Sequence, residues 1–478
     1  MAILKSKLGK IITSIAVVIV LLFGVVGYVG WYNLFREVPS EVYELPEDHF
    51  KYGSIGTEQA QGVPYWIWLV LPRIFPDKLP GPGGYTSLGI TWEEGKELPV
   101  GFSKKTIGFP RVGITCAVCH HATYRENLKD KPTIIAAGPA NRFDSQGYIR
   151  FLGNAASDPR FEPDYILDEI KYSHEFSWLE NLLYRFIIIP QTKKGLLQQS
   201  ADFAWTDSRP NWGPGRIDPF NPVKFTTLKL PKDDTIGNSD MMPLWNQKQH
   251  QNFALHWDGL ETSLRETVQT GAIGDGATKE SLPVEDLQRV EDYISELPPP
   301  KYPFAVDEQI ATQGKAIFNN TCASCHAFGG ERTGKVIPVE EVGTDRHRLD
   351  MWTQEAADTY NKFGDGYSWD FNQLRKTNGY VSVSLDGLWL RAPYLHNGSV
   401  PSLQDLLEKP ENRPQSFYRG FDVYDQNKVG FISEGEEAQR VGFKYDISVP
   451  GNSNQGHLYG TDLPVKDKQA LVEYLKTL

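Results

Sequence analysis

The chain has 478 residues, with 49 lysines and arginines against 60 aspartates and glutamates, and a formal net charge of −11. This acidic excess disfavours nucleic acid as a partner and fits either plain solubility or contact with a basic or dipolar redox protein. The length allows two or three domains, and 32 prolines with 43 glycines require many loops and turns.

An apolar segment stands at the N-terminus. Lys5, Lys7 and Lys10 precede an uncharged run whose apolar core, residues 11–31, is long enough to cross a bilayer as a helix. A cleaved signal peptide is the alternative, but it would need a shorter apolar region and a small-x-small cleavage site. The lysines predict a cytoplasmic N-terminus. We therefore expect residues 1–34 to be a single-pass anchor in the cytoplasmic (inner) membrane, with the bulk of the chain in the periplasm.

The pattern Cys-x-x-Cys-His occurs twice and contains all four cysteines of the chain. Its residues are Cys116, Cys119 and His120, and then Cys322, Cys325 and His326. In this pattern the thiols add to the vinyl groups of a haem and the histidine binds the iron. A redox dithiol or a Cys₄ zinc site needs no histidine after each pair, and only ten histidines occur. The sequence therefore predicts two covalently bound haem c groups.

Local patterns divide the remaining chain into two haem-containing parts. Residues 35–110 are rich in glycine, proline and aromatic residues, which predicts irregular structure around the first haem. Apolar positions within 287–297 predict an amphipathic helix that ends at the prolines of 297–303. Further helices are expected before the second motif and at the chain end. We predict a mainly α fold with long irregular loops and two cytochrome c-like haem domains, residues 35–300 and 301–478.

Three further stretches make the chain resemble the bacterial dihaem cytochrome c peroxidase superfamily. They are Pro243–Leu264 with His256-Trp-Asp-Gly259, Gly314–Phe318 before the second motif, and Leu390–Pro401 with Ala-Pro-Tyr-Leu-His-Asn-Gly-Ser. Within it, the chain is most similar to the rubber oxygenase-like branch, through Gly213–Pro219 and Asn452–Gly460. The resemblance implies one haem that meets the substrate and one that relays electrons, and it allows a calcium ion between them.

The resemblance also implies a sixth ligand for the second haem iron. Peroxidase members use a methionine there, whereas the rubber oxygenase-like pattern uses a histidine. His457 lies in the stretch that resembles this branch, just before the last predicted helix, so it is the predicted ligand. Met351, His347 and His396 are the alternatives. Ligation by two histidines would make this haem a low-spin electron relay.

The first haem has no evident second ligand near its motif. No histidine lies between His121 and His174, where peroxidase members have one. His256 is the candidate for the distal pocket, as an iron ligand or a proton carrier, and a core histidine bonded to backbone is the alternative. Trp257 is either a pocket wall and electron relay or part of the core. Leu260 replaces an arginine that is usual in the family.

Two weaker patterns concern ions and propionates. Four residues fit positions of a calcium-binding loop: Asp425, Asn427, Gly430 and Glu436. Val429 occupies another ligand position, which favours a simple glycine-containing turn. Arg216 and Asp218 are candidates to hold haem propionates, with a surface ion pair as the alternative.

These patterns predict a membrane-anchored, periplasmic dihaem c-type cytochrome oxidoreductase. Peroxide or dioxygen would bind at the first haem, and the second would relay electrons. A peroxidase is the leading activity; cleavage of an apolar, isoprenoid-like substrate by an oxygenase and plain electron transfer are the alternatives. The expected partners are the inner membrane and a small redox protein or quinol-linked electron donor, and no nucleic acid.

Overall fold

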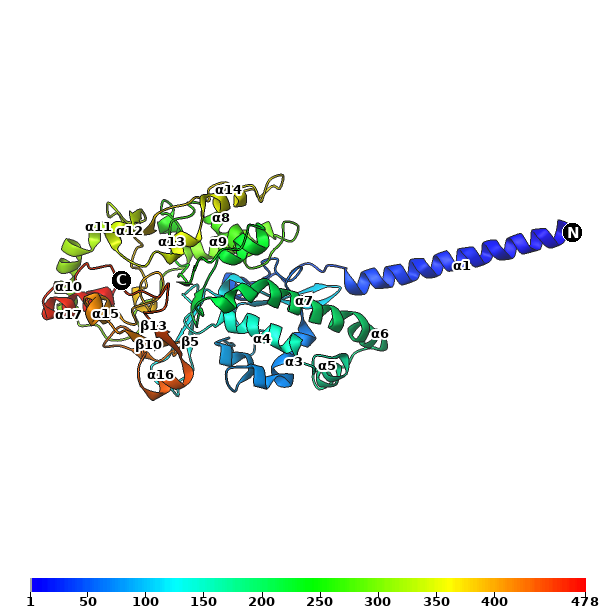
Figure 1. Cartoon of the computed structure of the whole chain (residues 1–478), viewed down its shortest axis with the longest axis horizontal. Coiled ribbons are helices and arrows are strands. Elements are labelled where there is room, and N and C mark those ends of the chain that lie inside the picture. The colour runs from blue at the N-terminus through cyan, green and yellow to red at the C-terminus, as the bar shows by residue number, and fades with distance from the viewer. Residues whose placement is uncertain (1) are drawn as a thin grey trace.

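The computed structural model describes residues 2–478, apart from the side chains of residues 2–9 and 11. Lys5 and Lys7, two of the lysines that predict the orientation of the N-terminus, therefore have side chains outside the described part. The chain is helix-rich, with 43% of it helical. Figure 1 shows one long helix that leaves a body containing every other element.

The long helix is α1 (Ala2–Leu34). Its segment Ile12–Leu34 is the one helix of residues 2–478 that is long and apolar enough to cross a membrane. Its length and composition fit an anchor and a signal sequence alike. The helix ends against a hairpin turn, where the Gly108 N–H donates to the Arg36 carbonyl at 2.7 Å. A Cβ on Gly108 would fall 2.2 Å from the Leu34 carbonyl carbon, so only glycine allows this approach.

The first part of the body packs short helices around a small antiparallel sheet. The helices are α2 (Pro46–Tyr52), α3 (Tyr65–Ile74), α4 (Ser145–Ser157), α5 (Pro163–Ile170), α6 (Trp178–Leu183), α7 (Ile189–Phe203), α8 (Leu264–Gly274) and α9 (Val284–Glu296). The sheet has the order β1-β3-β2, from β1 (Val63–Pro64), β2 (Phe102–Ile107) and β3 (Phe109–Ile114). Two ladders pair β4 (His121–Tyr124) with β5 (Thr133–Ala136) and β6 (Arg216–Ile217) with β7 (Ser239–Asp240).

The expectation that residues 35–110 are irregular is wrong. This segment contains α2, α3 and the β2–β3 hairpin. Several of its aromatic residues pack in the core and are not exposed on loops: Phe50, Trp68 and Phe102 are each at most 1% exposed. Glycine and proline content alone therefore misjudges a segment in which many of the large apolar side chains have a core to pack against.

The second part holds α10 (Glu308–Thr321), α11 (Ala323–His326), α12 (Val339–Val342), α13 (His347–Met351), α14 (Gln354–Tyr360), α15 (Leu403–Leu406), α16 (Gly435–Val441) and α17 (Val465–Leu475). Short ladders pair β8 (Val336–Pro338) with β9 (Gly379–Val381), β10 (Ser416–Arg419) with β13 (Phe443–Asp446), and β11 (Tyr424–Asp425) with β12 (Gly430–Phe431). The expected helices α9, α10 and α17 are confirmed. A Cβ on Gly314 would fall 1.9 Å from the Ala470 carbonyl oxygen, which explains the close packing of α10 on α17.

Two hydrophobic cores organise the body. The larger contains buried residues between Phe50 and Leu374, and the smaller surrounds α10, α17 and Trp389. Residues 351–374 follow the second haem motif in sequence but pack in the larger core, where the Tyr360 hydroxyl donates to the Thr270 carbonyl at 3.0 Å. Part of the chain that follows the second motif thus shares a core with the part that carries the first motif.

Candidate haem-binding site

The first motif forms a capped turn. The Thr115 hydroxyl accepts from the Ala117 N–H, and Cys116–Val118 then make one turn of 3₁₀-helix. All four cysteines of the chain are free thiols, which leaves each Cys-x-x-Cys pair open for thioether formation. Burial raises the pKa of Cys116 to about 12. The thiol is therefore protonated near pH 7, which is the form that adds to a vinyl group of haem.

The two proximal histidines are held in the same way. The Nδ1 atoms of His120 and His326 lie 2.7 Å from the backbone carbonyl oxygens of Met242 and Val383, respectively. Nδ1–H donates to the carbonyl in each case, so Nε2 is left for iron. Burial lowers the pKa of His120 to about 4 and also lowers that of His326. Both rings are therefore neutral near pH 7, which is the form that binds a metal.

His457 faces the second proximal histidine. The ring centroids of His326 and His457 lie 6.1 Å apart. Two metal–nitrogen bonds of about 2 Å, with the distance from each nitrogen to its ring centre added, would give about this separation. The Nδ1 atom of His457 is buried without a partner, and burial lowers the pKa of this ring to about 3. These residues fit an iron held between two neutral imidazoles.

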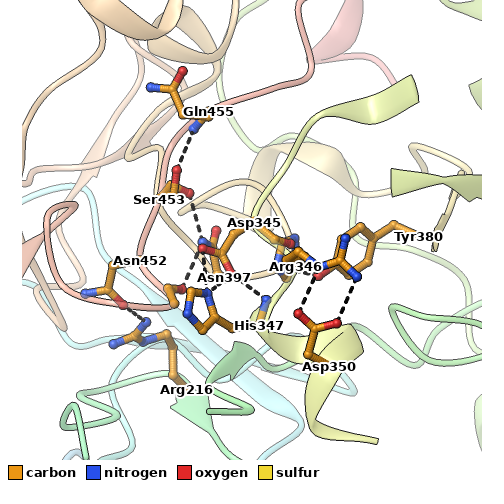
Figure 2. A network of polar contacts seen from close by, with 12 residues as sticks. Arg216, Asp345, Arg346, His347, Asp350, Tyr380, Asn397, Asn452, Ser453 and Gln455 are labelled. Carbon is orange, nitrogen blue, oxygen red and sulfur yellow. Dashed lines mark hydrogen bonds and ion pairs between the residues drawn. The ribbon is translucent and has the colours of Figure 1, made fainter. Parts of the chain in front are cut away.

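The loop that carries His457 is held by three buried side chains, Arg216, Asn397 and Arg413. The bonds run from Arg216 to Asn452 Oδ1 (2.7 Å), from Asn397 to the Ser453 carbonyl (2.9 Å), and from Arg413 to the carbonyls of Gly456 (3.0 Å) and His457 (3.2 Å). Figure 2 shows the first of these bonds beside Asn397 and Ser453. His457 has a φ of +48°, a conformation that costs free energy for a non-glycine residue. The bonds to its loop hold it there.

The expected ion pair of Arg216 with Asp218 is wrong, because each residue is at most 1% exposed and has other partners. Arg216 donates to the Trp212 carbonyl at 2.6 Å, and Asp218 accepts from the Asn221 side chain at 2.8 Å. Both side chains thus stabilise loop structure. Their role as propionate anchors stays a prediction.

The alternative sixth ligands are occupied elsewhere. His396 Nε2 lies 2.9 Å from the Tyr380 hydroxyl, and the two rings stack at 4.0 Å. His347 Nδ1 lies 2.9 Å from Asp345 in the polar network of Figure 2, and its side chain is 42% exposed. Met351 is fully buried in the larger core. Of the four candidates, the ring placed to face His326 is that of His457.

His256 lies close enough to the first motif for its charge to act there. After burial, the next influence that lowers the pKa of His120 is the charge of His256. His256 Nε2 lies 3.0 Å from Oε2 of Glu261, a carboxylate that is fully buried. The histidine thus has a carboxylate partner rather than the backbone partner of the core alternative. A histidine paired in this way can hold or pass a proton.

Trp257 connects the two segments that hold the proximal histidines. Its Nε1–H donates to the Asp240 carbonyl at 2.7 Å, and its own carbonyl accepts from the Val381 N–H at 2.8 Å. Asp240 lies two residues before Met242, and Val381 lies two residues before Val383. Trp257 therefore bridges the backbone segments that support both proximal histidines, and its role as an electron relay stays a prediction.

Asp275 is a candidate site residue that the sequence did not single out. It follows α8 directly, and its carboxyl group has no hydrogen-bond or ion-pair partner among the described residues. Burial raises its pKa to about 7, and its charge raises the pKa values of Cys116 and Cys119. An acid with a pKa near neutrality beside a haem attachment point is suited to proton exchange. Its sequence context, Gly-Asp-Gly, reads only as a turn.

The calcium-like pattern forms a hairpin turn, as the sequence analysis favoured. Asp425 Oδ1 accepts from the backbone N–H groups of Asn427 (2.9 Å) and Lys428 (3.1 Å), between β11 and β12. The carboxylate thus has the bonds of a turn residue. Residues 2–478 contain no group of three or more histidine, cysteine or acidic side chains placed to hold a metal ion.

Comparison with known proteins supports this chemistry. Residues 379–418 match the family model "RoxA-like, cytochrome c-like". That segment carries Val383, whose carbonyl holds His326, and Arg413, which holds the loop of His457. The chain is 28% identical over 324 residues to the uncharacterized protein y4iM of Sinorhizobium fredii, covering 57% of this chain and 72% of that protein.

It is also 30% identical over 257 residues to the uncharacterized protein y4iJ of the same organism. This match covers 39% of the chain and 42% of y4iJ, so the chain spans less than half of that relative. The family match supports a RoxA-like c-type cytochrome family, and hence an oxidoreductase that binds haem c.

Proposed function

We propose that the chain is a membrane-anchored, periplasmic dihaem oxidoreductase in which the first haem meets the substrate and the second relays electrons. The observation that carries the proposal is an asymmetry between two otherwise similar sites. The ring of His457 faces His326 at 6.1 Å, whereas no ring pair of this kind involves His120 in the described residues. This difference supports the proposal that the first site is the one open to an external molecule.

The residues of the chain have distinct tasks in this proposal. Haem c, when bound, supplies the redox chemistry. His256, supported by the buried Glu261, holds a proton near the first site, and Asp275 provides a second group that can exchange one near pH 7. Trp257 ties together the segments that carry the two proximal histidines, which gives electrons a short bonded path between the sites.

A peroxidase is the activity that these groups support best, because cleavage of a peroxide bond requires a positioned proton acceptor and donor. An oxygenase acting on an apolar, isoprenoid-like substrate is the second candidate, favoured by the resemblance to the rubber oxygenase-like branch. The electron donor would be a small redox protein or a quinol-linked donor. The acidic net charge of −11 suits a basic protein of this kind.

Mass spectrometry of the denatured holoprotein tests attachment. We expect two haem additions, one of which is lost when Cys116 and Cys119 are both changed to serine. The peroxide-reduction rate with a reduced donor should vanish in this variant, while the low-spin signal of the second haem persists. A protein that consumes peroxide but forms no product from an isoprenoid under oxygen supports the peroxidase. A protein that cleaves the isoprenoid under oxygen but does not consume peroxide supports the oxygenase. A single haem addition in the unmodified protein contradicts the proposal.

A further inference from the structure

An exposed apolar patch lies on α5, α6 and α7, and α5 and α6 stand at the end of the body from which α1 departs (Figure 1). It consists of Tyr165 and Tyr172 at α5, Trp178 and Leu182 in α6, Phe186 and Ile187 in the π-helical turn Tyr184–Ile188, and Leu197 in α7. We call it the α5–α7 patch. Trp178 is 75% exposed, Phe186 69% and Tyr172 85%. After residue 46, seven of the large exposed apolar side chains fall within residues 165–197 and eight in all the rest. Such a concentration marks a contact surface.

The stretch from α6 to α7 is apolar on its outer face as well as on its inner face. Trp178, Leu182 and Phe186 follow one another at intervals of four residues, which places them along one exposed side of the helix. Tyr184, Ile188 and Ile189 face the core and are at most 3% exposed. An aromatic stripe on the outside of an already packed helix contributes nothing to the fold of this chain, so it needs another partner.

The end of α1 fixes where a membrane surface would lie. The segment Ile12–Leu34 has 23 residues, or about 35 Å of helix, slightly more than a hydrocarbon core of about 30 Å. Tyr28, Trp31 and Tyr32 are exposed near its C-terminal end. Aromatic residues gather at the level of the lipid headgroups. The membrane surface would therefore pass close to residues 28–36.

Bonded contacts hold the patch at this same level. Gly108, in the β2–β3 turn, donates to Arg36 directly after α1. The next residue, Phe109, packs its ring edge-on against Tyr184, with centroids 6.3 Å apart. Tyr184 begins the π-helical turn that carries Phe186. Figure 1 shows α5 and α6 at the end of the body from which α1 departs.

We propose that the α5–α7 patch inserts into the headgroup region of the bilayer that α1 spans, so that the body is held at two points instead of one. We choose lipid as the partner of the patch because the aromatic end of α1 and the patch lie at the same height relative to the membrane surface. The two are connected through Gly108 and Phe109. Aromatic and aliphatic side chains on one helix face are the usual means of such shallow binding. The inference rests on the proposed anchoring of α1.

Lipid-phase photolabelling of the full-length holoprotein tests this contact. The protein is placed in nanodiscs of phosphatidylethanolamine and phosphatidylglycerol that contain a carbene-generating phospholipid, and labelled peptides are identified by mass spectrometry. We expect label in α1 and in residues 165–197. We expect none above background in residues 441–465, whose apolar side chains Val441, Leu458 and Val465 are equally exposed.

A triple variant, Trp178→Ser with Leu182→Ser and Phe186→Ser, should lose the label in residues 165–197 and keep it in α1. The matched control changes Val441, Leu458 and Val465 to serine and should keep both. Haem absorbance reports whether each variant is folded. Label in α1 alone overturns the proposal and leaves the anchor standing, whereas label in neither removes the anchor as well. An unlabelled patch in a protein that is dimeric by native mass spectrometry makes the patch a self-interface and also overturns the proposal.

Discussion

The two haem motifs have the same arrangement at the proximal histidine and differ in the groups on the opposite, distal side. His120 and His326 each donate from Nδ1 to a carbonyl at 2.7 Å, so their iron-binding nitrogens are prepared alike. The ring of His457 faces the second, whereas the first is accompanied by acid–base groups, the His256–Glu261 pair and Asp275. The proximal side follows from a five-residue motif. The group opposite comes from far along the chain and decides what each haem can do.

The largest effect should come from removing His457, the ring that faces the proximal histidine of the second site. His457→Ala takes away a strong-field nitrogen, so one of the two haems should change from low to high spin and its potential should rise. Electron paramagnetic resonance and a redox titration measure both. His347→Ala is the matched control, because that ring is exposed and paired with Asp345, and it should change neither. An unchanged low-spin signal in His457→Ala would transfer the role to Met351 or His396.

A second prediction concerns the proton at the first site. His256→Ala should leave the spin states of both haems unchanged and lower the rate of peroxide reduction by about 10²–10⁴-fold, the usual worth of a positioned acid–base group. Stopped-flow kinetics with pre-reduced protein measures it. His174→Ala, which removes a ring stacked on Trp66, is the control and should keep the rate. If His256→Ala instead creates a new high-spin haem, then His256 was a ligand and the first site was closed.

A third prediction concerns the loop that carries His457 at the second site. Arg413 holds this loop through carbonyl oxygens alone. Arg413→Lys keeps the charge but loses the fork that reaches Gly456 and His457 together. We expect a loss of about 1–3 kcal/mol in the free energy of unfolding and a partial high-spin signal at the second haem. Arg440→Lys, at an exposed pair with Glu437, should do neither. If Arg413→Lys remains folded and one haem becomes partly high-spin, Arg413 positions His457 in addition to stabilising the chain.

The smallest effect is expected at Asp275. Burial raises its folded-state pKa to about 7, so between about pH 4 and pH 7 the folded chain holds a proton that the unfolded chain releases. Stability therefore falls as pH rises through this range. Asp275→Asn removes that loss, and its advantage should reach on the order of 1–2 kcal/mol above pH 7 once partial exposure is discounted.

Thermal unfolding at pH 5 and pH 8 measures the trend at Asp275. The pH dependence of peroxide reduction near neutrality should flatten in the same variant. Asp144→Ala is a useful comparison, because Asp144 caps α4 by accepting from the Gly147 N–H. The loss of this cap should destabilise the chain at both pH values. An advantage of Asp275→Asn that is equal at the two pH values would exclude Asp275 as a titrating group.

Local pattern predicted several elements around the second motif. The apolar period of residues 287–297, the helix before Cys322 and the helix at the chain end all depend on neighbours three or four positions apart, and the structure contains each of them. The same holds for the hairpin at Asp425, where Val429 in place of an oxygen ligand pointed to a turn. His457 was accessible because the stretch around it resembles a known branch.

Long-range packing was not accessible from the sequence. Residues 351–374 join the larger core although they follow the second motif, because Trp352 packs against Phe220 at 4.9 Å. No spacing rule links Asp275 to Cys116, which lies more than 150 residues before it. A carboxylate such as Asp275 becomes a candidate only when the fold leaves it without hydrogen-bond or ion-pair partners. The bonds of Trp257 to Asp240 and Val381 likewise exist only in the folded chain.

The asymmetry of the two sites is tested most directly by cyanide binding to the oxidised holoprotein, followed by electron paramagnetic resonance. We expect that the second haem, low-spin with two histidine ligands, does not bind cyanide and that the first haem does. Conversion of only the first haem, identified with the Cys116→Ser, Cys119→Ser variant, supports the account. Two haems that both stay low-spin and bind no cyanide in either redox state would contradict it and leave an electron carrier.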